Sequence, residues 1–212
     1  EKNQIVAAAS GFPVLKNDKI SLSEEIIFHG NIVNESLNFF GNLKVEGNLI
    51  NSRLSVNGNL SFHSAEQSEI TVSGSIFLRD GVRFSTLLAD GKIHGTKDSF
   101  IKGGLTQSGE EIKIGSLGSP FSFNTEVEIT CSPFLKKRLR EEANPILETE
   151  FENRLVSALK KMDSFGIYAL RIVFPKTNLR IFNKSLKIDE EKKNRAYKNA
   201  GNGIYSRIIE NK

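Results

Sequence analysis

The stretch LKVEGNLINSRLSVNGNLSF, from Leu43 to Phe62, contains nearly the same motif twice. In each half, apolar residues alternate with polar ones up to a glycine, and Asn and Leu follow that glycine. Because side chains alternate between the two faces of a strand, the apolar residues and the glycine share one face. The motif therefore predicts short strands that bury one face and contain a glycine on it.

The same register recurs in six windows between Ile26 and Ile93. In every window the residues two before and two after the glycine are apolar, and the glycines are Gly30, Gly41, Gly47, Gly58, Gly74 and Gly91. The spacing is 17 residues from Gly30 to Gly47, from Gly41 to Gly58 and from Gly74 to Gly91, and 16 from Gly58 to Gly74. A fixed period of this size indicates a stack of equivalent units that bury their apolar faces on one another.

The period favours a mainly β protein whose residues 26–130 form a parallel β-helix, a solenoid of about six coils. The alternative is an antiparallel sandwich, because Asn57-Gly58 is a hairpin signal. In the other windows, however, the glycine is constant but the residue before it varies. A hairpin turn would require particular residues at both positions. A glycine on the buried face instead indicates a corner where another backbone approaches too closely for a Cβ atom.

Segments on both sides of the repeat complete the predicted organisation. Residues 1–25 contain strand-like runs and form a lead-in or cap. Residues 131–165 form a helical insert, since Ser132-Pro133 and Asn144-Pro145 are helix starts with a capping side chain followed by Pro at the first helical position. One apolar stripe of the second helix should pack on a partner, and it comprises Leu147, Phe151, Leu155, Leu159 and Met162.

The last part of the chain, residues 166–212, is predicted to contain strands and a basic tail that pack on the β-helix or extend it. The run IYALRIVF before Pro175 has the composition of a strand, as does GIYSRII near the end. Between them, the charged and Gly/Asn-rich segment from Glu190 to Gly203 is expected to be a mobile loop.

The composition of the chain indicates the cellular compartment of the protein and the charge of the surfaces that could bind partners. The chain has 212 residues, a net charge of +4 and one cysteine, Cys131. Between Ile26 and Ile129 there are 8 Lys and Arg against 11 Asp and Glu, so the positive excess lies in the carboxy-terminal part. A single cysteine and the lack of an 18-residue apolar run predict a cytoplasmic protein without a membrane span. The chain starts at Glu1 and not at Met, so we expect it to be part of a longer protein.

The order of motifs resembles one known family. G-N-[IL] coils are followed by IKGGL, by IGSLGSPFSFNTEVEI, by a Pro-initiated helical insert and by LRIVFPKTNLRIFNKSLKI. This succession, from about Ile5 to Ile209, resembles the β-helical domain of the FapA family, flagellar assembly protein A. Here the helical insert is short for that family, and its larger amino-terminal domain is missing.

The resemblance implies a right-handed parallel β-helix and a cytoplasmic, non-enzymatic scaffold of flagellar assembly or motility. Its partners would be proteins of the flagellar or polar machinery, and it would form a homo-oligomer. Bactofilins, which form cytoskeletal polymers, are similar in coil pattern but lack the helical insert.

No motif predicts a catalytic residue, a bound cofactor or a metal site. The three histidines, His29, His63 and His94, do not share one position in the coil, so surface histidines are expected in place of a metal site. A carbohydrate-active enzyme would need convergent carboxylates, but the neighbours Glu24-Glu25 and Glu110-Glu111 would face opposite ways on a strand. Asp80, Asp90 and Asp98 lie in successive coils and are more typical of corners. Phosphate-loop and nucleophile-elbow patterns are absent around Gly103-Gly104, Gly201-Asn202-Gly203 and the hydroxyls Ser116, Ser119 and Ser122.

Two features could form an interaction surface. One is the apolar stripe of the second helix, of which Phe151, Leu155, Leu159 and Met162 are the candidates. The other is basic and comprises Lys136, Lys137, Arg138 and Arg140, with Lys192, Lys193, Arg195 and Lys198 further along. A nucleic-acid or membrane-surface adaptor is the alternative function for the basic residues, but few aromatic residues lie beside them for base stacking. We therefore expect protein partners and no nucleic acid.

Overall fold

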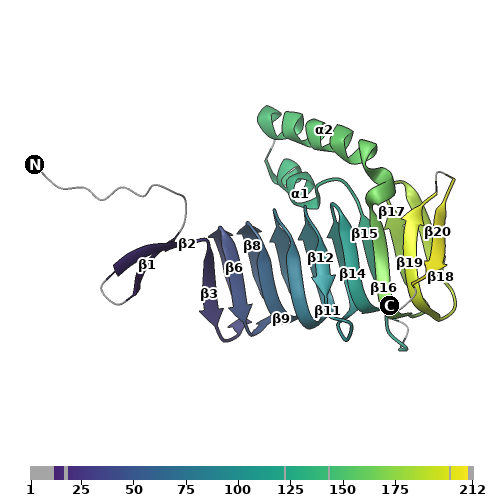
Figure 1. Ribbon diagram of the computed structural model, residues 1–212, viewed down its shortest axis with the longest axis horizontal. Coiled ribbons are helices and arrows are strands. Elements are labelled where there is room, and N and C mark those ends of the chain that lie inside the picture. The colour runs from purple at the N-terminus through teal and green to yellow at the C-terminus, as the bar shows by residue number, and fades with distance from the viewer. Residues whose placement is uncertain (1–11, 17–18, 122, 143, 201, 210–212) are drawn as a thin grey trace, which may run out of the picture.

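A computed structural model describes residues 12–16, 19–121, 123–142, 144–200 and 202–209. Most of these residues belong to one elongated β-solenoid with a helical pair at its side (Figure 1). The predicted fold class, a parallel β-helix with a helical insert and carboxy-terminal strands, is confirmed.

Six successive coils lie between Glu25 and Ile129. The first two have three strands each, and the later ones have longer strands that bend around a corner. In order, the coils are β3 (Glu25–His29), β4 (Ile32–Val33) and β5 (Ser36–Phe40); β6 (Asn42–Glu46), β7 (Asn48–Ile50) and β8 (Arg53–Asn57); β9 (Leu60–Glu66) and β10 (Glu69–Val72); β11 (Ile76–Ala89); β12 (Ile93–Gly95) and β13 (Phe100–Ser108); and β14 (Glu111–Leu117) and β15 (Thr125–Ile129).

Parallel pairing aligns equivalent residues of successive coils into ladders of apolar side chains. One ladder runs through Ile26, Leu43, Leu60, Ile76, Ile93, Ile112 and Ile167. Two others are centred on Leu49 and on Leu54, which are 0% and 1% exposed. Each inward side chain thus contacts equivalents in the coils before and after it, so the core is continuous along the solenoid.

The repeated glycines lie where the backbone of one coil approaches that of the next. A Cβ atom on Gly47 would lie 2.1 Å from the carbonyl oxygen of Gly30, and one on Gly58 would lie 2.2 Å from that of Gly41. Backbone atoms cannot yield that much, so only glycine fits at these corners. The prediction of close backbone approach is confirmed.

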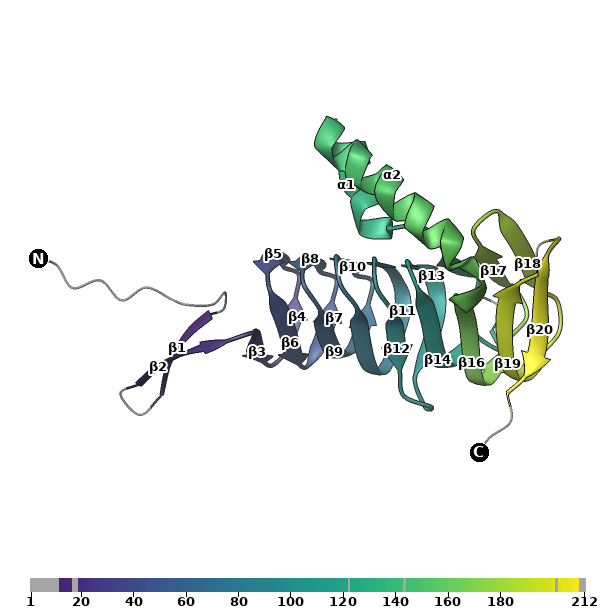
Figure 2. The same cartoon turned by 45° about the horizontal axis from the view of Figure 1, so that its top comes forward.

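Two helices interrupt the solenoid between its sixth and seventh coils. Helices α1 (Pro133–Glu141) and α2 (Pro145–Lys160) are followed by the short 3-10 helix η1 (Met162–Ser164). Coiling then resumes, because β16 (Gly166–Val173) pairs in parallel with β14, and β17 (Thr177–Ile181) with β15. Figure 2 shows α2 rising at an angle from the flank of the solenoid.

Antiparallel strands close the carboxy-terminal end. Strand β18 (Lys184–Ile188) pairs with β17, β19 (Lys192–Asn199) pairs with β16, and β20 (Ile204–Ile208) pairs with β19. Tyr197 of β19 lies opposite Ile167, is 1% exposed and covers the core. The expectation of a mobile loop from Glu190 to Gly203 is therefore wrong, because pairing with β16 and β20 imposes a strand despite the weak β-propensity of Lys and Asn.

The amino-terminal end is different. Strands β1 (Phe12–Lys16) and β2 (Lys19–Ser23) form a hairpin that is a sheet of its own and lies beyond the first coil (Figure 1). In the first coil, Phe28 is 42% exposed although its equivalent in the second coil, Val45, is 1% exposed. The prediction that the apolar residues flanking each glycine are buried thus fails for Phe28, because no coil among the described residues covers that side of it.

Candidate interaction surface on the helical insert

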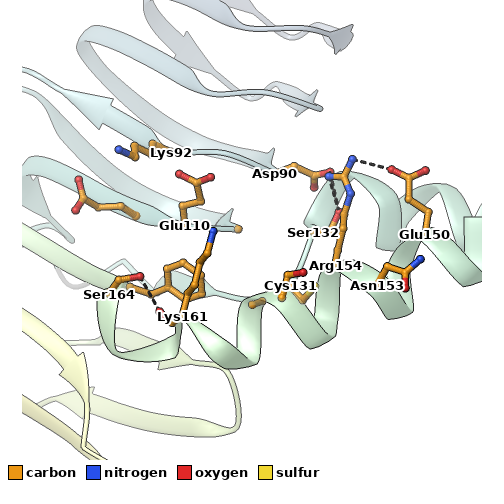
Figure 3. Close-up of a pocket in the computed structure, with 15 residues that line it drawn as sticks. Asp90, Lys92, Glu110, Cys131, Ser132, Glu150, Asn153, Arg154, Lys161 and Ser164 are labelled. Carbon is orange, nitrogen blue, oxygen red and sulfur yellow. Dashed lines mark hydrogen bonds and ion pairs between the residues drawn. The ribbon is translucent and has the colours of Figure 1, made fainter.

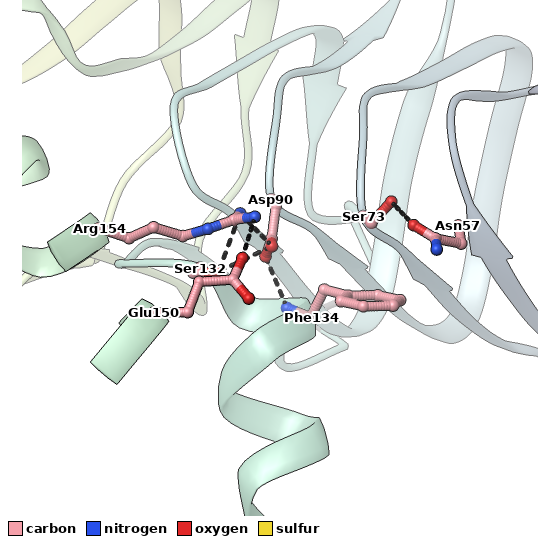
Figure 4. A network of polar contacts seen from close by, with 7 residues as sticks. All are labelled: Asn57, Ser73, Asp90, Ser132, Phe134, Glu150 and Arg154. Carbon is pink, nitrogen blue, oxygen red and sulfur yellow. Dashed lines mark hydrogen bonds and ion pairs between the residues drawn. The ribbon is translucent and has the colours of Figure 1, made fainter. Parts of the chain in front are cut away.

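Asp90 holds the start of α1 on the solenoid. Its carboxylate accepts hydrogen bonds from Ser132 Oγ at 2.7 Å, from the Phe134 backbone N–H at 2.8 Å and from Arg154 Nη1 at 2.8 Å (Figure 4). Asp90 follows β11 at the corner before Gly91, and its side chain is 4% exposed. One carboxylate therefore ties a coil corner, the first turn of α1 and the middle of α2 together.

This contact corrects the prediction that the Ser132 side chain caps α1. Ser132 adopts a left-handed backbone with φ 40°, and its hydroxyl donates to Asp90 without capping the helix. One free N–H of the first turn, that of Phe134, instead donates to Asp90, which lies 44 residues earlier in the sequence. Burial raises the pKa of the Asp90 carboxyl, although Ser132, Phe134 and Arg154 act in the opposite direction. Asn144 caps α2 as predicted, since its side chain accepts from the Ile146 N–H.

A second contact fixes the middle of α1. Lys137 Nζ lies 2.5 Å from Glu69 Oε1 and 3.2 Å from Thr71 Oγ1, and Arg53 Nε lies 2.9 Å from the other oxygen of Glu69. The hydrogen bond from Lys137 is the main reason that the pKa of Glu69 lies below its ordinary value. The Glu69 carboxylate thus connects α1 with two successive coils of the solenoid.

The four basic residues of α1 are therefore not equivalent. Lys137 is occupied at the solenoid, and Arg138 pairs with Glu142 one turn later at 3.3 Å. Lys136 and Arg140 have no ion pair within the part of the chain that the structure describes, and Arg140 is exposed. The structure therefore leaves two of the four predicted basic contacts available to a partner.

The apolar stripe of α2 is only partly covered. Leu147 is 7% exposed, Phe151, Leu155 and Met162 are half-buried, and Leu159 is 50% exposed. The exposed side of the same helix adds Ile146 at 76% and Val156 at 53%. The stripe packs at its amino-terminal end, where α1 lies beside it, and becomes accessible toward its carboxy-terminal end.

A groove of about 680 Å³ lies between α2 and the solenoid, and Asp90 and Arg154 are both part of its lining. In Figure 3, Arg154 and Glu150 lie near Asp90, while Lys161 and Ser164 lie further along the helical segment. Lys92, Glu110 and Lys161 line the groove without an ion pair among the described residues. The lining of the groove therefore carries both charge signs.

Cys131, at the wall of the same groove, is buried and free. Burial raises the pKa of its thiol above the ordinary value, and the charge of Asp90 acts in the same direction. A thiol with a raised pKa is a poor nucleophile at neutral pH, so the groove lacks an activated cysteine.

The other residues considered for chemistry are separated from one another. His29 and His94 each contact a carboxylate of the next coil, Glu46 at 2.8 Å and Glu111 at 2.7 Å. Asp98 pairs with Arg171, and Asp80 with Arg79. Within the described ranges, no three His, Cys, Asp or Glu side chains form a group that could hold a metal ion.

Several of the serines and glycines that were considered for catalysis or phosphate binding have roles in the backbone structure. Ser119 Oγ accepts from the Phe121 N–H, and Gly103-Gly104 has positive φ values of 68° and 79° at a coil corner. Ser122 and Gly201 lie outside the described residues. In the carboxy-terminal basic segment, Lys192 pairs with Glu190, and Lys193 lies 3.8 Å from Glu191.

Two features of this region have no signal in the local sequence. The capping role of Asp90 and the contact between Lys137 and Glu69 join residues that are 44 and 68 positions apart. The repeat places Asp90 at a corner, but nothing in it indicates that a helix would begin there. Sequence reasoning therefore identified the insert and its stripe but missed the side chains that attach it.

Comparison with known proteins agrees with this architecture. The model of the flagellar assembly protein A β-solenoid domain matches residues 13–164, which is more than half of the 212 residues. The matched part includes the first six coils and the helical insert and ends before β16. Searches of curated proteins and of solved structures gave no match. Among the described residues, the helices are too short or too polar to cross a membrane.

Proposed function

Because the chain belongs to the FapA family through its β-solenoid domain, we propose that it is a non-enzymatic scaffold of flagellar assembly or motility. In this role the solenoid supplies a rigid support, and protein partners bind to surfaces on it. We place this activity in the cytoplasm, where the expected partners are components of the flagellar or polar machinery.

The observation that carries the proposal is the way α2 is presented. The helix is attached to the solenoid by the Arg154–Asp90 ion pair, while Val156 and Leu159 remain half-exposed. A helix that is held rigidly and keeps an apolar stripe accessible is suited to binding a groove or a helix of another protein. Lys136 and Arg140 add positive charge beside it, so an acidic rim on the partner would fit.

The nucleic-acid and membrane alternatives have less support. Of the basic residues in question, Lys137, Arg138, Lys192 and Lys193 all have carboxylate neighbours. Paired cations release few counterions when they meet a polyanion, so they contribute little to such binding.

A complementation experiment tests the role and the surface together. The gene would be deleted in its own bacterium and replaced by the wild type, by Leu159→Glu or by Ile208→Glu. Leu159 lies on α2, and the matched control Ile208 is 63% exposed on β20. We expect the wild type and Ile208→Glu to restore flagella and swimming, and Leu159→Glu to fail at an unchanged protein level.

The two parts of the proposal can fail separately. Normal flagella and swimming after the deletion would overturn the flagellar role. Full rescue by Leu159→Glu, together with loss of function after the deletion, would keep the role but exclude the α2 stripe as the binding surface.

A further inference from the structure

A phenylalanine occupies a backbone position of the solenoid that suits few side chains. Phe84, in β11, has a φ of 48°, which lies in the left-handed region. The register of the flanking residues aligns it with Gln67 in the coil before and with Gly103 in the coil after. At the same corner, the first two coils have Asn34 and Asn51, also with positive φ. Asn and Gly adopt this conformation readily, whereas a bulky side chain is strained in it.

Burial does not explain the strained residue, because the Phe84 side chain is 46% exposed. Residues held in strained backbone conformations cluster at sites that bind other molecules. The surroundings of Phe84 therefore indicate what this corner of the solenoid could bind.

Neighbouring coils provide space for two aromatic rings here. A Cβ atom on Gly103 would lie 2.7 Å from Cδ1 of Phe84, and one on Gly81 would lie 2.7 Å from Cε1 of Phe100. Each ring thus occupies the space that a side chain on the adjacent coil would need. Phe123, which is 42% exposed, contacts Phe84 edge to face with the ring centroids 4.9 Å apart. Phe84 and Phe123 therefore form an aromatic pair that stays nearly half exposed.

Two cations lie beside this pair. Arg83 Cζ is 4.6 Å and Lys102 Nζ is 4.4 Å from the centroid of the Phe100 ring. Arg83 and Lys102 are opposite each other in the pairing of β11 with β13, and neither forms an ion pair among the described residues. These contacts and the sequence neighbours Arg83-Phe84 join the side chains into one surface. We call it the aromatic corner, and it comprises Arg83, Phe84, Phe100, Lys102 and Phe123.

The charges of the aromatic corner fit a single carboxylate better than a polyanion. Arg83 and Lys102 lie on adjacent strands, which are about 4.8 Å apart, so both can donate to one carboxylate. The row does not continue as a basic track, because the residue opposite Arg83 in the preceding coil is the exposed Glu66. Nucleic acid would need such a track and parallel rings for successive bases, but the planes of Phe84 and Phe123 meet at 82°.

We propose that the aromatic corner binds a short segment of a partner protein in which an acidic residue stands beside a large apolar one. The carboxylate accepts hydrogen bonds from Arg83 and Lys102, and the apolar side chain packs on Phe84 and Phe123. This surface is distinct from the helical insert, since Asp90, which holds the insert, follows the end of β11. The proposal rests on the scaffold role above only for the class of occupant, and its test measures binding and not motility.

NMR titration of the purified full chain identifies the occupant. The probes are three pools of synthetic peptides with random flanks whose central residues are Glu-Phe-Glu, Lys-Phe-Lys or Glu-Ala-Glu. We expect the Glu-Phe-Glu pool, at millimolar concentration, to shift the amide signals of the aromatic corner. The other two pools should bind at least about tenfold more weakly, because one reverses the charge and the other lacks the apolar side chain. A single-stranded oligouridine is the probe for nucleic acid.

Two matched variants test the surface. Phe84→Asn and Phe77→Asn each replace a 46% exposed Phe of β11, and Phe77 lies against His94 outside the aromatic corner. Asn is the residue that the first two coils have in place of Phe84, so the first variant keeps the local conformation. We expect Phe84→Asn to weaken binding of the Glu-Phe-Glu pool at least about tenfold and Phe77→Asn to leave it unchanged. In urea, Phe84→Asn should unfold at a midpoint no lower than that of Phe77→Asn, because it relieves strain.

Several results would overturn the proposal. Unchanged signals of the aromatic corner with the Glu-Phe-Glu pool would exclude an acidic and apolar segment as the occupant, as would equal binding of the other two pools. Tighter binding of oligouridine would assign the surface to nucleic acid. Equal binding by the two Asn variants would place the site elsewhere, and a clearly lower urea midpoint for Phe84→Asn would give this ring a structural role instead.

Discussion

At the scale of single residues, one polar side chain breaks an otherwise aliphatic ladder. Thr106 lies between Leu87 and Val127 and is 0% exposed. Its hydroxyl has no hydrogen-bond partner among the described residues. Thr125 is equally buried, but its hydroxyl accepts from the Gly103 N–H at 2.8 Å. The unsatisfied hydroxyl of Thr106 therefore destabilises the fold, whereas the hydrogen-bonded hydroxyl of Thr125 stabilises it.

Replacing these two threonines by valine separates the roles. Thr106→Val removes an unsatisfied buried hydroxyl at nearly constant volume and should stabilise the fold by about 1 kcal/mol. Thr125→Val leaves the Gly103 N–H without its acceptor and should destabilise the fold by about 1–3 kcal/mol. Urea unfolding of both variants measures the change, and a shift of the same sign in both would refute this assignment.

Asp90 is the residue on which the attachment of the insert depends most. Asp90→Ala removes the hydrogen bonds to Ser132 and Phe134 and the ion pair with Arg154. Loss of a helix cap alone costs about 1 kcal/mol, and Arg154 would also lose its partner. We expect faster amide hydrogen exchange throughout α1 and α2 while the coils stay protected.

Asp98→Ala is the control for this experiment, because Asp98 also pairs with an arginine but is 88% exposed. Its removal should leave exchange in the insert unchanged, as exposed ion pairs contribute little. Unchanged exchange in Asp90→Ala would show that the helices are held by other contacts.

At the scale of elements, α1 is held by an ion pair whose strength depends on pH. Lys137 keeps the pKa of Glu69 below its ordinary value of 4.5, so this carboxylate stabilises the folded state above that pH. The stabilisation is lost as pH falls through the lowered pKa of the folded state. The attachment of α1 should therefore weaken in acid.

The substitution Glu69→Gln tests this dependence. Because the carboxylate is partly exposed and screened by solvent, we expect a loss of at most about 1 kcal/mol at pH 7. The difference from the wild type should shrink toward zero as the pH is lowered below 4.5. Urea unfolding at several pH values measures it, and Glu66→Gln, an exposed residue of the preceding strand, is the control. A difference that does not depend on pH would contradict the ion-pair explanation.

At the scale of the whole molecule, the two ends of the solenoid differ in how the core is closed. Tyr197 lies over the last coil, its hydroxyl has no partner in the described part of the chain, and burial raises its pKa to about 12. The ring therefore acts as an apolar cover. The antiparallel strands that carry it prevent a further copy from continuing the solenoid.

Tyr197→Asp should remove this closure. An unpaired carboxylate in the core costs several kcal/mol, so β19 and β20 would detach before burying it. The exposed edges of β16 and β17 would then promote association beyond the wild-type state, measured by light scattering. Tyr205→Asp, at a 43% exposed tyrosine of β20, should scatter like the wild type. Equal scattering from both variants would show that Tyr197 does not close the end.

The sequence by itself determined the solenoid, because a 17-residue spacing of glycines and flanking apolar residues is a direct record of coil-to-coil register. It also determined the helix starts at Pro133 and Pro145, since the geometry of proline at the first helical position is local, although of the two predicted caps only Asn144 forms. Of the interaction surface, it indicated the stripe and the basic cluster but not which of their side chains remain accessible.

Only the tertiary structure decided how the insert is attached and how the ends are closed. Asp90 meets Phe134, and Lys137 meets Glu69, across separations of 44 and 68 residues, for which no periodicity exists. Strand β19 forms because β16 and β20 supply its hydrogen-bond partners, against the preference of its own residues. Phe28 and Val45 occupy equivalent positions in the repeat, and only the presence or absence of a covering coil makes one exposed and the other buried.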